Sequence, residues 1–88
     1  MLEINDSFVK TLEKRCTRYL APGSVFEIHN IDIDFIEGIW YTFTIAWGPA
    51  DGNNWHSDEI IVEDKEANID FISGMVAQLV YMNERGDC

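Results

Sequence analysis

The chain has 88 residues, an apolar fraction of 47% and a formal net charge of −10 at pH 7 from sixteen acidic and six basic residues. This length supports one domain over residues 1–88, with a single core and little room for an enclosed substrate cavity. The composition excludes a disordered acidic tail. The charge argues against direct binding to nucleic acid or to an anionic membrane, because phosphate binding requires a cationic surface.

The first predicted element is a helix over residues 7–20, with Asp6 or Ser7 as its N-cap. An apolar stripe recurs at helical spacing along it: Phe8, Leu12, Cys16 and Tyr19. Three basic residues recur on the opposite side: Lys10, Lys14 and Arg18. We interpret this basic stripe as a solvated helix face. Pro22 and Gly23 are expected to stop the helix.

Three strands are predicted next. Polarity alternates over residues 24–35, but its parity changes near His29-Asn30, so we expect a β-bulge there. The bulge would keep all the large apolar residues of this strand inward: Phe26, Ile28, Ile31, Ile33 and Phe35. Glu37-Gly38 marks a turn, and residues 39–47 form the clearest strand, rich in aromatic and β-branched side chains. The third strand covers residues 57–63.

The last predicted element is a helix over residues 65–84, with Asp64 and Glu66 at its positive N-terminal end and Gly86 after it. Gly74 falls in its middle, where we expect a close contact with the sheet or the other helix. Its solvated stripe is expected near five residues: Asp70, Ser73, Ala77, Tyr81 and Glu84. The fold class is therefore α+β, in the order α-β-β-β-α, with both helices on one face of a three-stranded antiparallel sheet.

The other face of this sheet is expected to stay open. Its predicted occupants are Glu27, Asp32, Asp34, Trp40, Thr42, Thr44, Glu59, Ile61 and Glu63. Trp47 should lie in the core, whereas Trp55 either contacts a partner or folds back over the end of the hairpin. The candidate partner-binding residues are Glu27, Asp32, Asp34, Trp40, Trp55, Asp58, Glu59 and Glu63.

Metal sites and catalysis find little support in the sequence. Neither Asp32-x-Asp34 nor the segment that begins at Asp51 has the ligand spacing of a calcium loop, and zinc would require His29, His56 and Cys16 to converge. The glycines form no phosphate-binding loop, and no nucleophile elbow occurs. We therefore expect a non-catalytic protein with no cofactor and no metal. We also expect it to be cytoplasmic, because the first ten residues do not resemble a signal peptide.

The order of elements is similar to that of the double-stranded-RNA-binding module. That module binds RNA through basic residues, whereas the last helix here is preceded by Asp64-Lys65-Glu66. The departure argues against RNA binding.

Size, charge and element order together resemble, as a class, the small acidic proteins that phages encode against nucleic-acid enzymes, including anti-CRISPR proteins and DNA mimics. The resemblance implies an inhibitor that occupies a basic, nucleic-acid-binding protein surface in the host cytoplasm. It transfers no motif and no functional residue. Two alternatives stay open: an immunity or antitoxin protein that caps a basic toxin nuclease, and a structural or regulatory module that forms a homodimer through its last helix.

Overall fold

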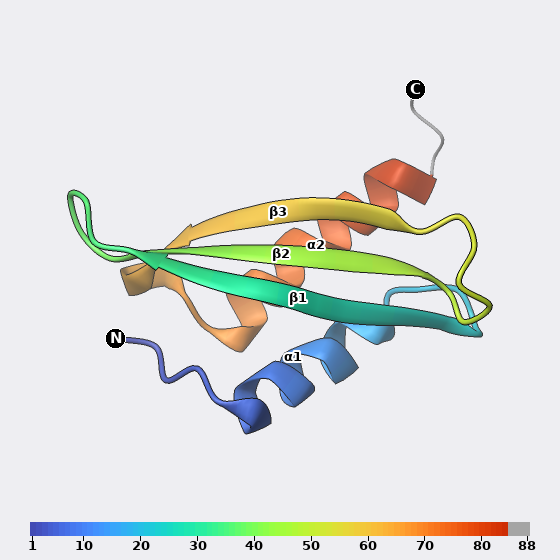
Figure 1. Cartoon of the computed structure of the whole chain (residues 1–88), viewed down its shortest axis with the longest axis horizontal. Helices are drawn as coiled ribbons and strands as arrows, with labels where there is room; N and C mark the ends of the chain where they lie inside the picture. The colour runs from blue at the N-terminus through green and yellow to red at the C-terminus, as the bar shows by residue number, and fades with distance from the viewer. Residues whose placement is uncertain (85–88) are drawn as a thin grey trace.

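The computed structural model describes residues 1–84, and within them the elements follow the predicted order (Figure 1). The elements are α1 (Asp6–Thr17), β1 (Ser24–Asp34), β2 (Trp40–Pro49), β3 (His56–Glu63), a 3-10 turn η1 (Asp64–Glu66) and α2 (Ile69–Glu84). The three strands form an antiparallel meander with β2 in the centre, and in Figure 1 α2 lies behind this sheet while α1 lies below β1. The predicted α+β fold is thus confirmed. Within the described residues no helix has the length and apolarity to cross a membrane.

The predicted β-bulge in β1 is confirmed. Ile28 lies opposite Ile45, but the next paired residue of β1 is Asn30, opposite Thr44, so His29 is the inserted residue. The insertion restores the inward parity of Ile31. At the bulge, a carboxylate of α1 holds the edge of the sheet, because Oε2 of Glu13 accepts a hydrogen bond from the backbone N–H of Ile28 at 2.9 Å.

The core lies between the sheet and the two helices. The central strand supplies four alternate residues to it: Tyr41, Phe43, Ile45 and Trp47. Trp47 is only 3% exposed, so its predicted place in the core is confirmed. From the helices, Leu12 and Cys16 of α1 and an aliphatic row of α2 complete this core: Ile72, Val76 and Val80. Burial of these stripes places both α1 and α2 on one face of the sheet and leaves the opposite face uncovered by either helix.

The ends of α1 differ from the prediction. The N-cap is Asn5, whose Oδ1 accepts from the N–H of Phe8 at 2.9 Å, instead of Asp6 or Ser7. Asn, Asp and Ser are about equally good caps, so composition alone does not choose among adjacent candidates. The helix ends at Thr17, five residues before Pro22, and Tyr19 lies beyond it, 37% exposed.

The predicted start of the last helix is wrong. Asp64 and Glu66 form the separate turn η1, and Asn68 precedes α2, its Oδ1 accepting from the N–H of Phe71 at 2.8 Å. Asp64 has a tertiary role instead: its Oδ1 accepts from the hydroxyl of Tyr41 at 2.5 Å and from the N–H of Leu2 at 3.0 Å. The hydrogen bond from Tyr41 holds the pKa of Asp64 below its usual value, while burial raises the pKa of Tyr41.

Two expectations for the middle of α2 are also wrong. Gly74 is exposed, and a β-carbon built on it meets no atom within 4 Å, so the glycine marks no close contact. Its neighbour Ser73, expected on the solvated stripe, is 2% exposed and donates its hydroxyl to the carbonyl of Asp70 at 3.1 Å. The predicted stop at Gly86 lies outside the described residues.

Candidate protein-binding surface

The strand register brings most of the predicted site residues onto the uncovered face of the sheet. Because Tyr41, Phe43 and Ile45 point toward the helices, the residues between them in β2 and their partners in β1 and β3 point away. We call the resulting surface the acidic sheet face. It comprises Glu27, Asp32 and Asp34 of β1, Trp40, Thr42 and Thr44 of β2, and Glu59, Ile61 and Glu63 of β3.

The carboxylates of this face form two rows separated by an uncharged strand. Strand β2 contains no charged residue, and its Trp40 lies between Asp34 on one side and Glu63 on the other. The two rows are therefore two strand spacings apart, or about 10 Å. At that separation two carboxylates repel each other by only ~0.4 kcal/mol in water, so the fold tolerates this arrangement.

Short-range contacts orient several of these carboxylates. Glu27 lies 2.9 Å from Nε2 of His29, and Asp32 accepts from the side-chain amide of Asn30 at 3.1 Å. Glu63 lies 3.6 Å from Nζ of Lys65. Within residues 1–84 this is the single ion pair that a Lys or Arg makes with the face. The acidic sheet face therefore keeps a net negative charge.

The two tryptophan candidates have different roles. Trp55 folds back over the end of the β2–β3 hairpin, where its Nε1 donates to the carbonyl of Pro49 at 2.9 Å. Its ring lies directly on Gly48, since a β-carbon built there would be 2.6 Å from ring atoms. Trp40, by contrast, lies half-buried between the two acidic rows. Trp40 is thus the tryptophan that belongs to the acidic sheet face, and Trp55 covers the end of the hairpin.

Asp58 does not belong to the acidic sheet face. It lies opposite Ile45, so its side chain points to the same face of the sheet as the helices. The side chain is nevertheless exposed, because it lies outside the core. Its Oδ1 accepts from the N–H of Glu59 at 2.7 Å. Asp58 lies on that side because alternate residues of a strand point to the same face, and Ile60 and Val62 point toward the helices.

The β1–β2 turn carries two exposed apolar residues, one of which, Phe35, the sequence pattern placed in the core. Phe35 is 65% exposed and Ile36 is 74% exposed, and we call these two residues the apolar tip. The strand ends at Asp34, whose Oδ1 accepts from the N–H of Ile36 at 2.9 Å and starts the turn. The aspartate itself is the sequence signal, because Asp side chains favour turns by accepting from the backbone two residues on, but the alternation of polarity predicted a longer strand.

The residues considered for metal binding or reactivity lie apart. His29 is in the bulge of β1, His56 stacks on Trp47 with ring centroids 5.5 Å apart, and Cys16 is buried in the core. In the part of the chain that the structure describes, no three His, Cys, Asp or Glu side chains are grouped to hold a metal ion. Burial raises the pKa of Cys16 to about 12, so its thiol stays protonated at neutral pH.

Comparison of the chain with profiles of protein families, with curated protein sequences and with solved structures gave no match.

Proposed function

We propose that the protein binds a basic surface of a partner protein through the acidic sheet face, without catalysing a reaction. The observation that supports this proposal is the pair of carboxylate rows, one on each side of Trp40, on the sheet face opposite α1 and α2. The basic residues of α1 and of its C-cap belong to the opposite layer of the molecule: Lys10, Lys14, Arg15 and, at the C-cap, Arg18.

The physics of such a surface favours a cationic partner. A face that carries one sign of charge attracts an oppositely charged protein and accelerates association by 10- to 1,000-fold at low ionic strength. Stable binding also needs desolvated contact area, and aromatic residues supply much of it at interfaces. Trp40 provides an aromatic side chain on the face, and Phe35 of the apolar tip lies one residue beyond Asp34.

We propose further that the partner uses this basic surface to bind nucleic acid, so that the protein acts as an inhibitor of the anti-CRISPR or DNA-mimic type. Carboxylates then take the place of backbone phosphates, which are the principal anions that such surfaces neutralise. An immunity protein that caps a basic toxin nuclease would use the same face. A dimerising module would instead use α2, on which Phe71 and Met82 are 40% and 58% exposed.

A pull-down from the native host, followed by a competition assay, tests this proposal. The immobilised protein should retain a basic nucleic-acid-binding protein, and Glu59→Lys should reduce the retention. Glu66→Lys is the matched control, because Glu66 is an exposed acid in η1, outside the sheet. The retained protein, purified, should lose its labelled nucleic acid when wild-type protein is added. Retention that both substitutions leave unchanged would contradict the proposal, as would nucleic-acid binding that the added protein does not reduce.

A further inference from the structure

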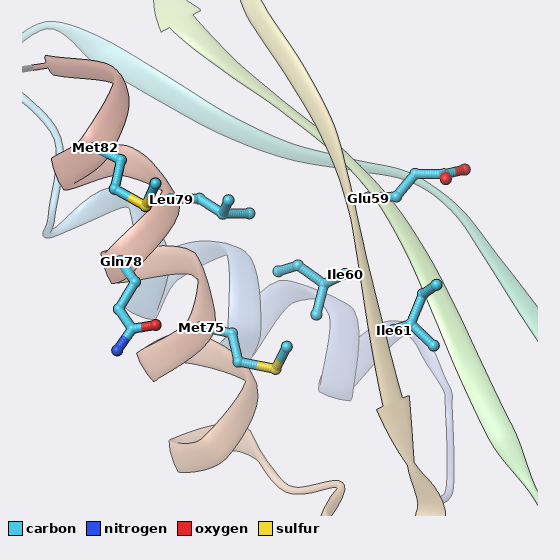
Figure 2. Close-up of a pocket in the computed structure, with 7 residues that line it drawn as sticks. All are labelled: Glu59, Ile60, Ile61, Met75, Gln78, Leu79 and Met82. Carbon is cyan, nitrogen blue, oxygen red and sulfur yellow. The ribbon is translucent and has the colours of Figure 1, made fainter. Parts of the chain in front are cut away.

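An apolar groove of about 180 Å³ runs between the outer edge of β3 and α2 (Figure 2). Met75, Leu79 and Met82 line it from the helix, and the side chain of Ile60 points toward them from the strand. Glu59 and Ile61 line the groove from β3, while their side chains point away from α2. The groove therefore lies beside the main chain of β3 itself.

The outer edge of β3 offers unpaired main-chain groups to this groove. Strand β3 is the last strand of the sheet, and Asp64, directly after it, donates its N–H to the carbonyl of Ile39 at 2.8 Å. The main-chain N–H and C=O groups of alternate residues in a strand point to the same side. Those of Ile60 and Val62 therefore point toward β2, as the N–H of Asp64 does, whereas those of Glu59, Ile61 and Glu63 point outward. The N–H of Glu59 is already bonded to the side chain of Asp58.

The two edges of the sheet differ in the helix side chains that lie beside them. On β1, the outward N–H of Ile28 is satisfied by Glu13 of α1. On β3, helix α2 leaves the apolar groove beside Ile61 instead. Natural proteins usually cover or block an exposed edge strand, because it is a template for pairing with another chain.

We propose that the edge of β3 accepts an extended segment of the partner as a fourth strand, and that this segment alternates basic and apolar residues. The side chains of an added strand point alternately to the two faces of the sheet. Those on the helix side enter the groove beside Met75 and Met82, where apolar residues fit. Those on the other side lie next to Glu59 and Glu63, where lysine or arginine fits. The partner of the proposed function is therefore expected to present such a segment. The basic positions of the segment rest on the proposed function.

A second copy of this chain is the wrong occupant on charge grounds. Each β3 brings Asp58, Glu59 and Glu63 and no lysine or arginine. Antiparallel pairing of two copies centred on Ile61 would set Glu59 of one copy directly opposite Glu63 of the other. Like charges directly opposite each other destabilise a sheet. Charge complementarity therefore selects a cationic strand.

Two synthetic peptides of equal composition test the proposal: KVKVKVK, in which the residue types alternate, and KKKKVVV, in which they do not, both with blocked ends. We expect the first to bind at least tenfold more tightly in an NMR titration at low salt. It should protect the amide of Ile61 from hydrogen exchange and shift the methyl signals of Met75 and Met82. Met82→Lys should weaken its binding about tenfold, whereas Thr11→Lys, the same charge change on an exposed residue of α1, should leave it unchanged.

Each other result overturns the inference. Equal binding of both peptides, with shifts confined to Asp32, Thr42 and their neighbours, would refute strand addition and leave the acidic sheet face as the binding surface. Failure of both peptides to bind would refute the strand site. The proposed function would still be tested separately, by the pull-down with Glu59→Lys. A dimer of the protein alone in sedimentation, lost in Met82→Lys, would make a second copy the occupant.

Discussion

Replacement of Gly74 by alanine should stabilise the protein. Glycine in a helix interior is about 0.8–1.0 kcal/mol less favourable than alanine, because it loses more conformational freedom on folding. Gly74 lies in the middle of α2, is exposed, and has no atom within 4 Å of the position that a β-carbon would take. The new methyl group therefore meets no steric cost. We expect a gain of about 1 kcal/mol in the free energy of unfolding, or about 4–8 °C in the melting temperature of a domain of this size.

The matched variant is Gly48→Ala, which adds the same methyl group where there is no room for it. A β-carbon on Gly48 would lie 2.6 Å from Cγ and Cδ1 of Trp55 and 3.0 Å from its Cα, so both the ring and the main chain must move. Overpacking of this kind costs typically 1–3 kcal/mol. Urea titrations followed by circular dichroism measure both variants under the same conditions.

The two glycine variants should therefore move stability in opposite directions. A destabilised Gly74→Ala would refute the reasoning, since it would mean that the surface around Gly74 is in contact with another part of the molecule or with a second copy. A neutral Gly48→Ala would refute the placement of Trp55 over the hairpin.

Three further predictions follow from individual contacts. Glu13→Ala should lower the free energy of unfolding by about 1–2 kcal/mol in urea, because the N–H of Ile28 loses its acceptor, whereas Glu13→Gln keeps one. Because the pKa of Asp64 is lowered in the folded state, the ionised carboxylate stabilises the protein above pH ~4, and this contribution is lost as the pH falls through the pKa in the folded state. Tyr41→Phe removes the hydrogen bond that lowers this pKa, so a plot of melting temperature against pH should fall less steeply on its acid side. Cys16 should resist iodoacetamide at pH 8 in the folded protein and react in urea, measured by mass spectrometry in a chain whose other cysteine is replaced by serine.

Local patterns in the sequence predict much of the fold. The aromatic and β-branched run that became β2, the change of parity at His29 and the turn at Glu37-Gly38 each depend on neighbouring residues alone. Both residues of that turn have positive φ, 55° for Glu37 and 114° for Gly38, as a tight connection requires. Once the parity of each strand is known, the register of an antiparallel meander follows, and with it the placement of Glu27, Asp32, Asp34, Glu59 and Glu63 on one face.

The features that could not be predicted depend on contacts between distant residues or on competition among adjacent ones. Asp64 joins Leu2 and Tyr41, which lie 62 and 23 positions away in the chain, so no local pattern distinguishes it from a helix-capping acid. Phe35 has the parity of a core residue, and only the turn that starts at Asp34 removes it from the strand. The groove beside β3 likewise arises from the distance between two elements, which sequence periodicity does not encode.

The salt dependence of partner binding tests the central claim most directly. Reversal of one carboxylate changes its interaction with a partner cation about 7 Å away by ~1.2 kcal/mol in water, or about tenfold in affinity. We therefore predict that the dissociation constant of the retained partner, measured by calorimetry, rises steeply with salt, is about tenfold higher for Glu59→Lys and is unchanged for Glu66→Lys. A dissociation constant that neither salt nor Glu59→Lys alters would contradict the account.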